Sequence, residues 1–185
     1  MTFPKYKYLL TYRFSEIIHD STVLFCQRYL AGFDFRRTRE QAIQAARSGK
    51  QNIVEGVGQS QTSKKGEIKL LGVAKASIEE LIVDLEDFLR QRGLKIWLKT
   101  DPRVARLRQL TFRLTNISNL GDLGNLKEKL VLPANQEEAA NLLLTLCHQA
   151  TYLLDRQIKT LEDKFVREGG YTEKLFQKRL VVKYK

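Results

Sequence analysis

The residues best suited to metal binding are two cysteines and two histidines, the only residues of these types in the chain. They are His19, Cys26, Cys147 and His148. If their segments pack together, a Cys2His2 zinc site is conceivable, because zinc prefers thiolate and imidazole ligands. Neither pair has the close spacing of structural zinc sites. Both cysteines fit apolar stripes, where a free thiol packs as a small hydrophobic group, so we expect no metal and no cofactor.

Two glycine-containing runs have some features of phosphate-binding loops. Before Gly49-Lys50, the position that needs a glycine holds Gln44, and no serine or threonine follows the lysine. Gly56-x-Gly58 is too short for a dinucleotide fingerprint, and neither run follows a predicted strand. We interpret both runs as positions of close helix packing and helix termination.

The acidic residues provide no pattern for catalysis. Di-metal helical bundles place a Glu-x-x-His motif on each of two helices, and this chain contains the motif only once, at Glu16 to His19. A cluster of carboxylates is therefore interpreted as a solvated helix face: Glu79, Glu80, Asp84, Glu86 and Asp87. Glu55 lies beside Asn52 in a tightly packed segment, and we interpret it as a structural group that could be buried and hydrogen-bonded. We therefore expect no enzyme.

Positive charge is the most informative property of the sequence. The chain has 32 lysines and arginines against 21 acidic residues, which gives a net charge of +11 and a pI near 9.7. Such a chain attracts polyanions, because phosphate contacts release condensed counterions. The excess is uneven: segment 67–94 is net acidic, and segment 131–155 has no lysine or arginine. This asymmetry favours a partner site over a general solubilising charge. Nucleic acid is the favoured partner of such a basic chain, and an acidic protein or a membrane surface is the alternative.

The predicted nucleic-acid-binding residues lie at two predicted helix starts, further along the second predicted helix and near the C-terminus. They are Arg36, Arg37, Arg39, Arg47, Lys50, Lys64, Lys65, Lys69, Lys174, Lys178 and Arg179. The arginine fork can donate two hydrogen bonds to one phosphate. Trp97, Phe176 and Tyr184 could stack on unpaired bases, although Trp97 is as well suited to covering the core.

Helical spacing of apolar residues predicts an all-α chain. Four long helices are expected over about 6–31, 36–59, 63–92 and 134–167. Short links between the first three helices predict antiparallel neighbours. The expected fold is therefore an antiparallel, up-and-down four-helix bundle over residues 1–170.

The predicted helix boundaries rest on capping residues. Gly32 is expected to end the first helix and Gly93 the third. The Thr62-Ser63 pair should cap the start of the third helix, with Glu67 in its first turn, and Asn135 should cap the fourth. The apolar face expected in the first helix consists of Leu10, Phe14, Ile17, Ile18, Leu24 and Phe25.

A seam of small or polar residues runs along the second predicted helix. It contains Ala42, Ala45, Gly49, Asn52 and Gly56, with Glu55 beside it. Glycine inside a helix costs about 1 kcal/mol relative to alanine, so a compensating contact is expected. Close approach of a neighbouring helix backbone is the simplest one. We expect this helix to pack on both sides and its small-residue face to help build an oligomer.

Two segments lie outside the four long helices. The connector 94–132 is predicted to contain a short helix from Asp101-Pro102 to Leu114 and a turn over 116–124. Residues 171–185 form a predicted basic C-terminal tail, which follows Gly169-Gly170. The connector should therefore be helical in part, and the tail should carry cations and aromatic residues.

Two motifs carry a family resemblance. The run from Ala45 to Gly56 contains Asn-Ile-x-Glu-Gly, and the run from Ala74 to Leu81 contains small residues, a serine and Glu-Leu. The two motifs and their separation along the chain resemble those of a four-helix bundle family. That family includes ribosomal RNA intervening-sequence proteins and the accessory variability protein of diversity-generating retroelements. Segment 168–175 is similar to the branch that carries a four helix bundle suffix. The resemblance covers residues 10–93 and 134–185.

This resemblance implies a homopentameric ring. It also implies a non-enzymatic accessory protein that binds RNA or DNA and assists a reverse transcriptase. The alternative expectation is an oligomeric protein–protein scaffold with no role in nucleic-acid binding. The N-terminus has no signal-peptide pattern, and no run of eighteen apolar residues is present. With only two cysteines, these features predict a cytoplasmic protein that does not insert into membranes.

Overall fold

The predicted all-helical character is confirmed by a computed structural model, which describes residues 4–115 and 131–183. These residues form helices and no β-strand. The elements in chain order are the 3-10 turn η1 (Lys5–Tyr8), α1 (Leu10–Tyr29), the 3-10 turn η2 (Phe33–Phe35), α2 (Arg36–Gln59), α3 (Lys64–Gln91), α4 (Pro102–Thr115), α5 (Gln136–Glu168) and α6 (Tyr171–Lys183). The predicted turn at 116–124 lies outside the described residues.

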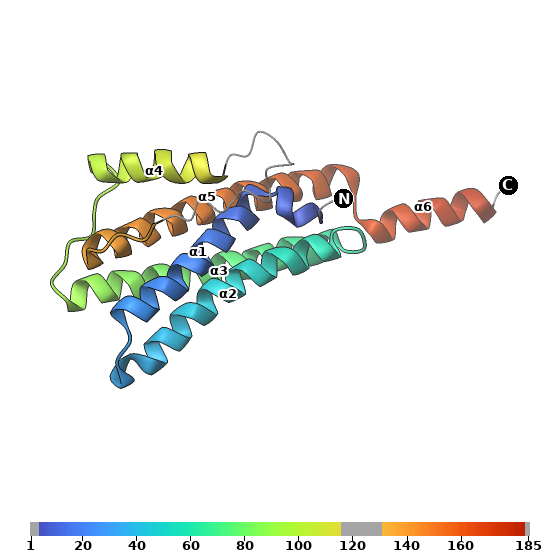
Figure 1. Cartoon of the computed structure of the whole chain (residues 1–185). Helices are drawn as coiled ribbons and strands as arrows, with labels where there is room; N and C mark the ends of the chain where they lie inside the picture. The colour runs from blue at the N-terminus through green and yellow to red at the C-terminus, as the bar shows by residue number, and fades with distance from the viewer. Residues whose placement is uncertain (1–3, 116–130, 184–185) are drawn as a thin grey trace.

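The core lies where α1, α2, α3 and α5 face one another (Figure 1). α2 packs on α3 and α1, α5 packs on α3 and α1, and α4 lies mainly against α5. Each of the four long helices contributes a fully buried residue, for example Ile18, Ile53, Ile78 and Leu146. Full burial of one such side chain stabilises the fold by about 1.5–3 kcal/mol.

The small-residue seam of α2 packs closely on α3, as the sequence predicts. A Cβ atom on Gly49 would lie 2.9 Å from Cγ1 of Ile78, and one on Gly56 would lie 3.4 Å from the carbonyl oxygen of Glu67. The contact is within the chain, so the part of the seam at Gly49 and Gly56 is not available to build an oligomer as we expected. Asn52 is only half-buried.

Glu55 differs from its interpretation as a possible buried group. Its side chain is exposed on α2, one position before the buried Gly56. The polar link between α2 and α3 is made instead by Ser48 and Ser77, whose Oγ atoms lie 3.0 Å apart. Serine fits here because its hydroxyl can both donate and accept a hydrogen bond.

Three of the four helix caps predicted from the sequence agree with the structure. The Ser63 hydroxyl accepts from the amide of Gly66, and Asn135 Oδ1 accepts from Glu137 and Glu138. Gly93 and Gly169 have φ of 63° and 67°, the left-handed conformation that ends helices. Gly32, in contrast, is extended, with φ −68° and ψ 158°. The first helix therefore ends earlier, at Tyr29.

The buried face of α1 differs in part from the apolar face predicted from the sequence. Leu10 and Leu24 were expected in the core, but their exposed fractions are 38% and 46%. The buried face contains Phe14, Ile18 and Phe25, and it includes small polar residues that helical periodicity alone does not identify. The start also differs, because Lys5–Tyr8 forms a 3-10 turn before α1 begins at Leu10.

The C-terminal segment is a helix rather than an unstructured tail. Glu173 supports the start of α6, because its Oε2 accepts from the amide of Gly170 at 2.8 Å. α6 then extends away from the other helices (Figure 1). In the connector, α4 spans Pro102–Thr115, which confirms the short helix predicted there.

The close contact at Gly49 gives a testable difference between two glycines of α2. Gly49→Ala should lower the free energy of unfolding by about 1 kcal/mol, because overpacking of up to about 3 kcal/mol exceeds the gain in helix propensity of about 1 kcal/mol. Gly58→Ala is the matched control, since nothing lies within 4 Å of its added Cβ. It should raise the same free energy by about 1 kcal/mol. Urea denaturation of both variants measures the difference, and equal shifts would contradict the packing.

Candidate nucleic-acid interface

Cations from three separate elements meet at one end of the helical body. The turn between α2 and α3, the 3-10 turn η1 and the second half of α5 enclose an open cavity of about 450 Å³. Its lining includes Lys5 and Arg156, and the charges of Lys64 and Lys164 act on Glu67 in the same lining. We call Lys5, Lys64, Arg156 and Lys164 the basic pole, together with the exposed Lys65 and Lys69 nearby on α3.

Glu67 is the acidic group at the centre of the basic pole. Its side chain is buried, with 7% of the residue exposed. Burial raises the pKa of Glu67, although the positive charges of Lys64 and Lys164 act in the opposite direction. One buried carboxylate cannot neutralise the surrounding cations, so the pole keeps a positive surface that faces solvent.

The structure brings part of the predicted site together here. Lys64, Lys65 and Lys69 lie at the basic pole, and α6 begins beside it because α5 ends there (Figure 1). Lys174 of α6 forms an ion pair with Glu168, with 3.6 Å between Nζ and Oε2. Lys178 and Arg179 lie further out on α6, where both are exposed. Binding of nucleic acid by these α6 residues stays a prediction.

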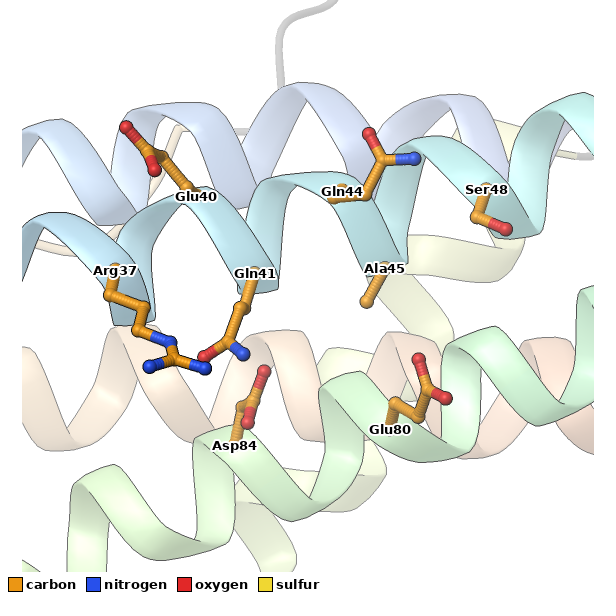
Figure 2. Close-up of a pocket in the computed structure, with 8 residues that line it drawn as sticks. All are labelled: Arg37, Glu40, Gln41, Gln44, Ala45, Ser48, Glu80 and Asp84. Carbon is orange, nitrogen blue, oxygen red and sulfur yellow. The ribbon is translucent and has the colours of Figure 1, made fainter.

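The arginines at the start of α2 lie at the opposite end of the body. Arg36 pairs with Glu40 at 2.9 Å, and Arg39 Nη1 donates to the carbonyl oxygen of Leu30. Arg37 lines a groove between α2 and α3, and Figure 2 shows its guanidinium beside Gln41. The three arginines therefore do not belong to the basic pole, and Arg36 and Arg39 already have partners within the chain.

Arg47 and Lys50 lie midway along α2, on the side that faces α1. Lys50 Nζ donates to Nδ1 of His19 at 3.0 Å. Burial lowers the pKa of His19, and the positive charges of Lys50 and Arg47 lower it further, against the effect of Asp20. A neutral imidazole can accept the bond from the ammonium group. Lys50 is thus engaged within the chain, while Arg47 is exposed.

Trp97 has a structural role in the described part of the chain. Its Nε1 donates to Glu137 Oε1 at 2.8 Å, and the guanidinium carbon of Arg103 lies 3.8 Å from the ring centre. Arg103 therefore covers one face of the Trp97 ring, and a base cannot stack on that face. Phe176 is 57% exposed on α6, and Tyr184 lies outside the described residues.

Sequence reasoning missed two groups of cations. Lys5, Arg156 and Lys164 come from segments far apart in the chain, and no local pattern predicts their approach to α3. The second group is α4, whose fourteen residues include four arginines and no acidic residue. That composition was visible in the sequence, and it identifies α4 as a basic helix on the surface of α5.

The cysteines and histidines do not form a metal-binding cluster. Cys26 and Cys147 are fully buried in the core, which confirms their predicted packing as small apolar groups. Burial raises the pKa of the Cys26 thiol to about 12, and it raises that of Cys147 as well. His148 is exposed. Within residues 4–115 and 131–183, no three His, Cys, Asp or Glu side chains are placed to share a metal ion.

Among the described residues, no helix is both long and apolar enough to cross a membrane. Comparison with known protein families, with curated proteins and with solved structures finds no match. The geometry of the site is therefore the basis for assigning a function.

Proposed function

We propose that this chain is a non-enzymatic protein that binds RNA or DNA through the basic pole. The observation that carries the proposal is the meeting of Lys5, Lys64, Arg156 and Lys164 from three elements, in a chain of net charge +11. Ammonium and guanidinium groups bind phosphate oxygens by charge-assisted hydrogen bonds. Release of counterions from the nucleic acid supplies the free energy, so the binding is independent of base sequence.

The family resemblance supports a more detailed proposal. In it, α1, α2, α3 and α5 are the antiparallel, up-and-down four-helix bundle, and α4 belongs to the connector. The protein acts as an oligomeric accessory factor of a reverse transcriptase and holds the nucleic acid during copying. The motif residues Asn52 and Glu55 lie on α2, and Glu55 is exposed there. An exposed motif carboxylate is suited to contact with a protein partner.

A protein–protein scaffold is the second candidate function. The observation that favours it is α6, which exposes several large apolar residues, including Phe176 and Val182. Exposed apolar side chains of this kind are typical of protein-binding surfaces. A partner that co-purifies after nuclease treatment would support this function without nucleic-acid binding.

Charge reversal at the basic pole tests the proposed function. Lys64→Glu/Lys65→Glu should weaken binding of a labelled structured RNA and of duplex DNA at least about tenfold at low salt. It should also reduce the slope of log affinity against log salt by about 2, one for each lost phosphate contact. Fluorescence anisotropy measures both quantities.

The matched control for this test is Arg90→Glu/Lys99→Glu. It changes the net charge by the same amount, and both residues are exposed near the opposite end of α3. This control should keep most of the affinity. Equal losses in the two variants would mean that net charge, rather than the basic pole, determines binding.

A further inference from the structure

The helix α6 has an apolar surface that its own chain leaves uncovered. Tyr171, Leu175, Phe176, Val181 and Val182 are 43–78% exposed. α6 has thirteen residues and extends away from the other helices (Figure 1). Isolated helices shorter than about 12–15 residues are marginal in water. Both its exposed apolar residues and its short length therefore indicate a partner that covers α6.

The order of side chains around α6 specifies the chemistry of that partner. Successive residues turn by 100°, so Tyr171, Leu175 and Val182 fall on one side of the helix. Lys174 flanks this apolar stripe on one side and Arg179 on the other, and Lys178 lies at its edge. Phe176 and Val181 lie on other faces of α6. A stripe of this kind fits a groove with an apolar floor and acidic rims.

A groove with these properties runs between α2 and α3. Two adjoining cavities of about 640 and 310 Å³ share Gln41 and Asp84 in their linings. Small and apolar residues such as Ala45 and Leu81 belong to the floor. The charged lining residues are Asp34, Glu40, Glu80, Asp84 and Asp87, against Arg37 and Arg92. Glu40 forms an ion pair with Arg36, and Asp87 forms one with Arg90. The negative charge that complements the cations of α6 therefore comes from Asp34, Glu80 and Asp84.

Asp84 is the carboxylate of this groove that most needs a cation. Figure 2 shows it on α3 beneath Gln41, between the two helices. The side chain is half-buried and forms no hydrogen bond or ion pair with another described residue. Burial raises the pKa of Asp84, and the charges of Asp87 and Glu80 raise it further. A lysine or arginine placed beside it would offset this cost.

The lengths and positions of α6 and of the groove favour docking of α6 on a second copy rather than on its own chain. From Arg37 to Ser48 the groove follows α2 for about 17 Å, and α6 is about 20 Å long, at 1.5 Å per residue. Within one chain, Glu80 lies sixteen residues along α3 from Lys64, or about 24 Å from the end where α6 begins. α6 points away from that groove, so it cannot lie along it in its own chain.

We propose that α6 of one copy docks in the acidic groove between α2 and α3 of a second copy. The contact joins different surfaces of the two copies, so repetition gives a closed ring or an open chain. This proposal deepens the oligomeric part of the proposed function and does not depend on nucleic-acid binding. It assigns Lys174, Lys178 and Arg179 to a protein contact rather than to phosphate.

The test compares molar masses of the full-length chain by size exclusion with light scattering, after nuclease treatment. The variant of α6, called the arm variant, is Lys178→Glu/Arg179→Glu. The variant of the groove, called the groove variant, is Glu80→Lys/Asp84→Lys. Each variant alone should lose the oligomeric mass of the wild type. A mixture of the two variants should restore the oligomeric mass. The unchanged α6 of the groove variant can dock in the unchanged groove of the arm variant, and the acidic α6 of the arm variant is complementary to the basic groove of the groove variant.

Two controls keep the test decisive. Lys64→Glu/Lys65→Glu should keep the oligomeric mass while it weakens nucleic-acid binding, so the two proposals can fail separately. Far-UV circular dichroism checks the fold, and the exposed Glu80→Lys alone replaces the groove variant if the double variant does not fold. A monomeric wild type at all concentrations, an unchanged mass of the arm variant, or a mixture of folded variants that stays dissociated would each overturn the proposal.

Discussion

Phe25→Ala is expected to lower the free energy of unfolding by about 3–5 kcal/mol, the range for deletion of a buried aromatic side chain. Phe25 is 2% exposed, and its ring centre lies 4.8 Å from that of Phe88 on α3, in an edge-to-face arrangement. The substitution removes apolar contact area and leaves a cavity between α1 and α3 that surrounding side chains fill only in part. Urea denaturation followed by circular dichroism measures the loss.

The neighbouring Leu24→Ala is the matched control for this prediction. Leu24 is on the same helix but is 46% exposed, so its substitution should change the free energy of unfolding by less than about 0.5 kcal/mol. Comparable losses at the two positions would mean that α1 is rotated from the orientation described here. Large losses at both positions would restore the apolar face expected from the sequence, which contains both residues.

Asn141→Ala is expected to lower the free energy of unfolding by about 2–4 kcal/mol, because it removes part-buried hydrogen bonds that hold two backbone groups of the segment after α3. Asn141 is 2% exposed on α5. Its Oδ1 accepts from the amide of Trp97 at 2.8 Å, and its Nδ2 donates to the carbonyl oxygen of Lys95 at 2.9 Å. These bonds hold the segment after α3 against α5. Thermal and urea denaturation both measure the loss.

Asn52→Ala is the matched control for Asn141→Ala. Asn52 is half-buried, and its Nδ2 donates locally to the Oγ and the carbonyl oxygen of Ser48, one turn earlier on α2. The same truncation should therefore cost less than about 1 kcal/mol. If the two variants lost equal stability, the link between α5 and the segment 95–97 would not have the importance that the structure gives it.

Much of the fold follows from local patterns in the sequence. Apolar residues at helical spacing identify the long helices, and cap residues such as Ser63, Asn135 and Gly93 locate most of their ends. Both signals act within a few residues, so they can be recognised in the sequence without knowledge of tertiary contacts. The buried face of α1 is different, because it depends on which neighbours α1 meets, and those contacts bury Ser15, Ser21 and Thr22.

The candidate site was only partly predictable for the same reason. Lys64 and Lys65 follow from the basic start of α3, whereas Lys5 and Arg156 reach the same end through tertiary packing alone. The partners that engage Arg39 and Lys50 are likewise distant in sequence, since the hydrogen bonds link them to Leu30 and His19. Composition therefore predicts that the chain is basic, and packing determines which cations remain available.

The central claim is that the chain binds nucleic acid through electrostatic contacts at one end. Its most direct test is the salt dependence of wild-type binding to a labelled structured RNA and a duplex DNA, followed by fluorescence anisotropy. We expect similar affinities for unrelated base sequences and a slope of log affinity against log salt of about −3 to −6, from several lysine and arginine contacts with phosphate. No binding at about 50 mM salt, or an affinity independent of salt, would contradict the claim.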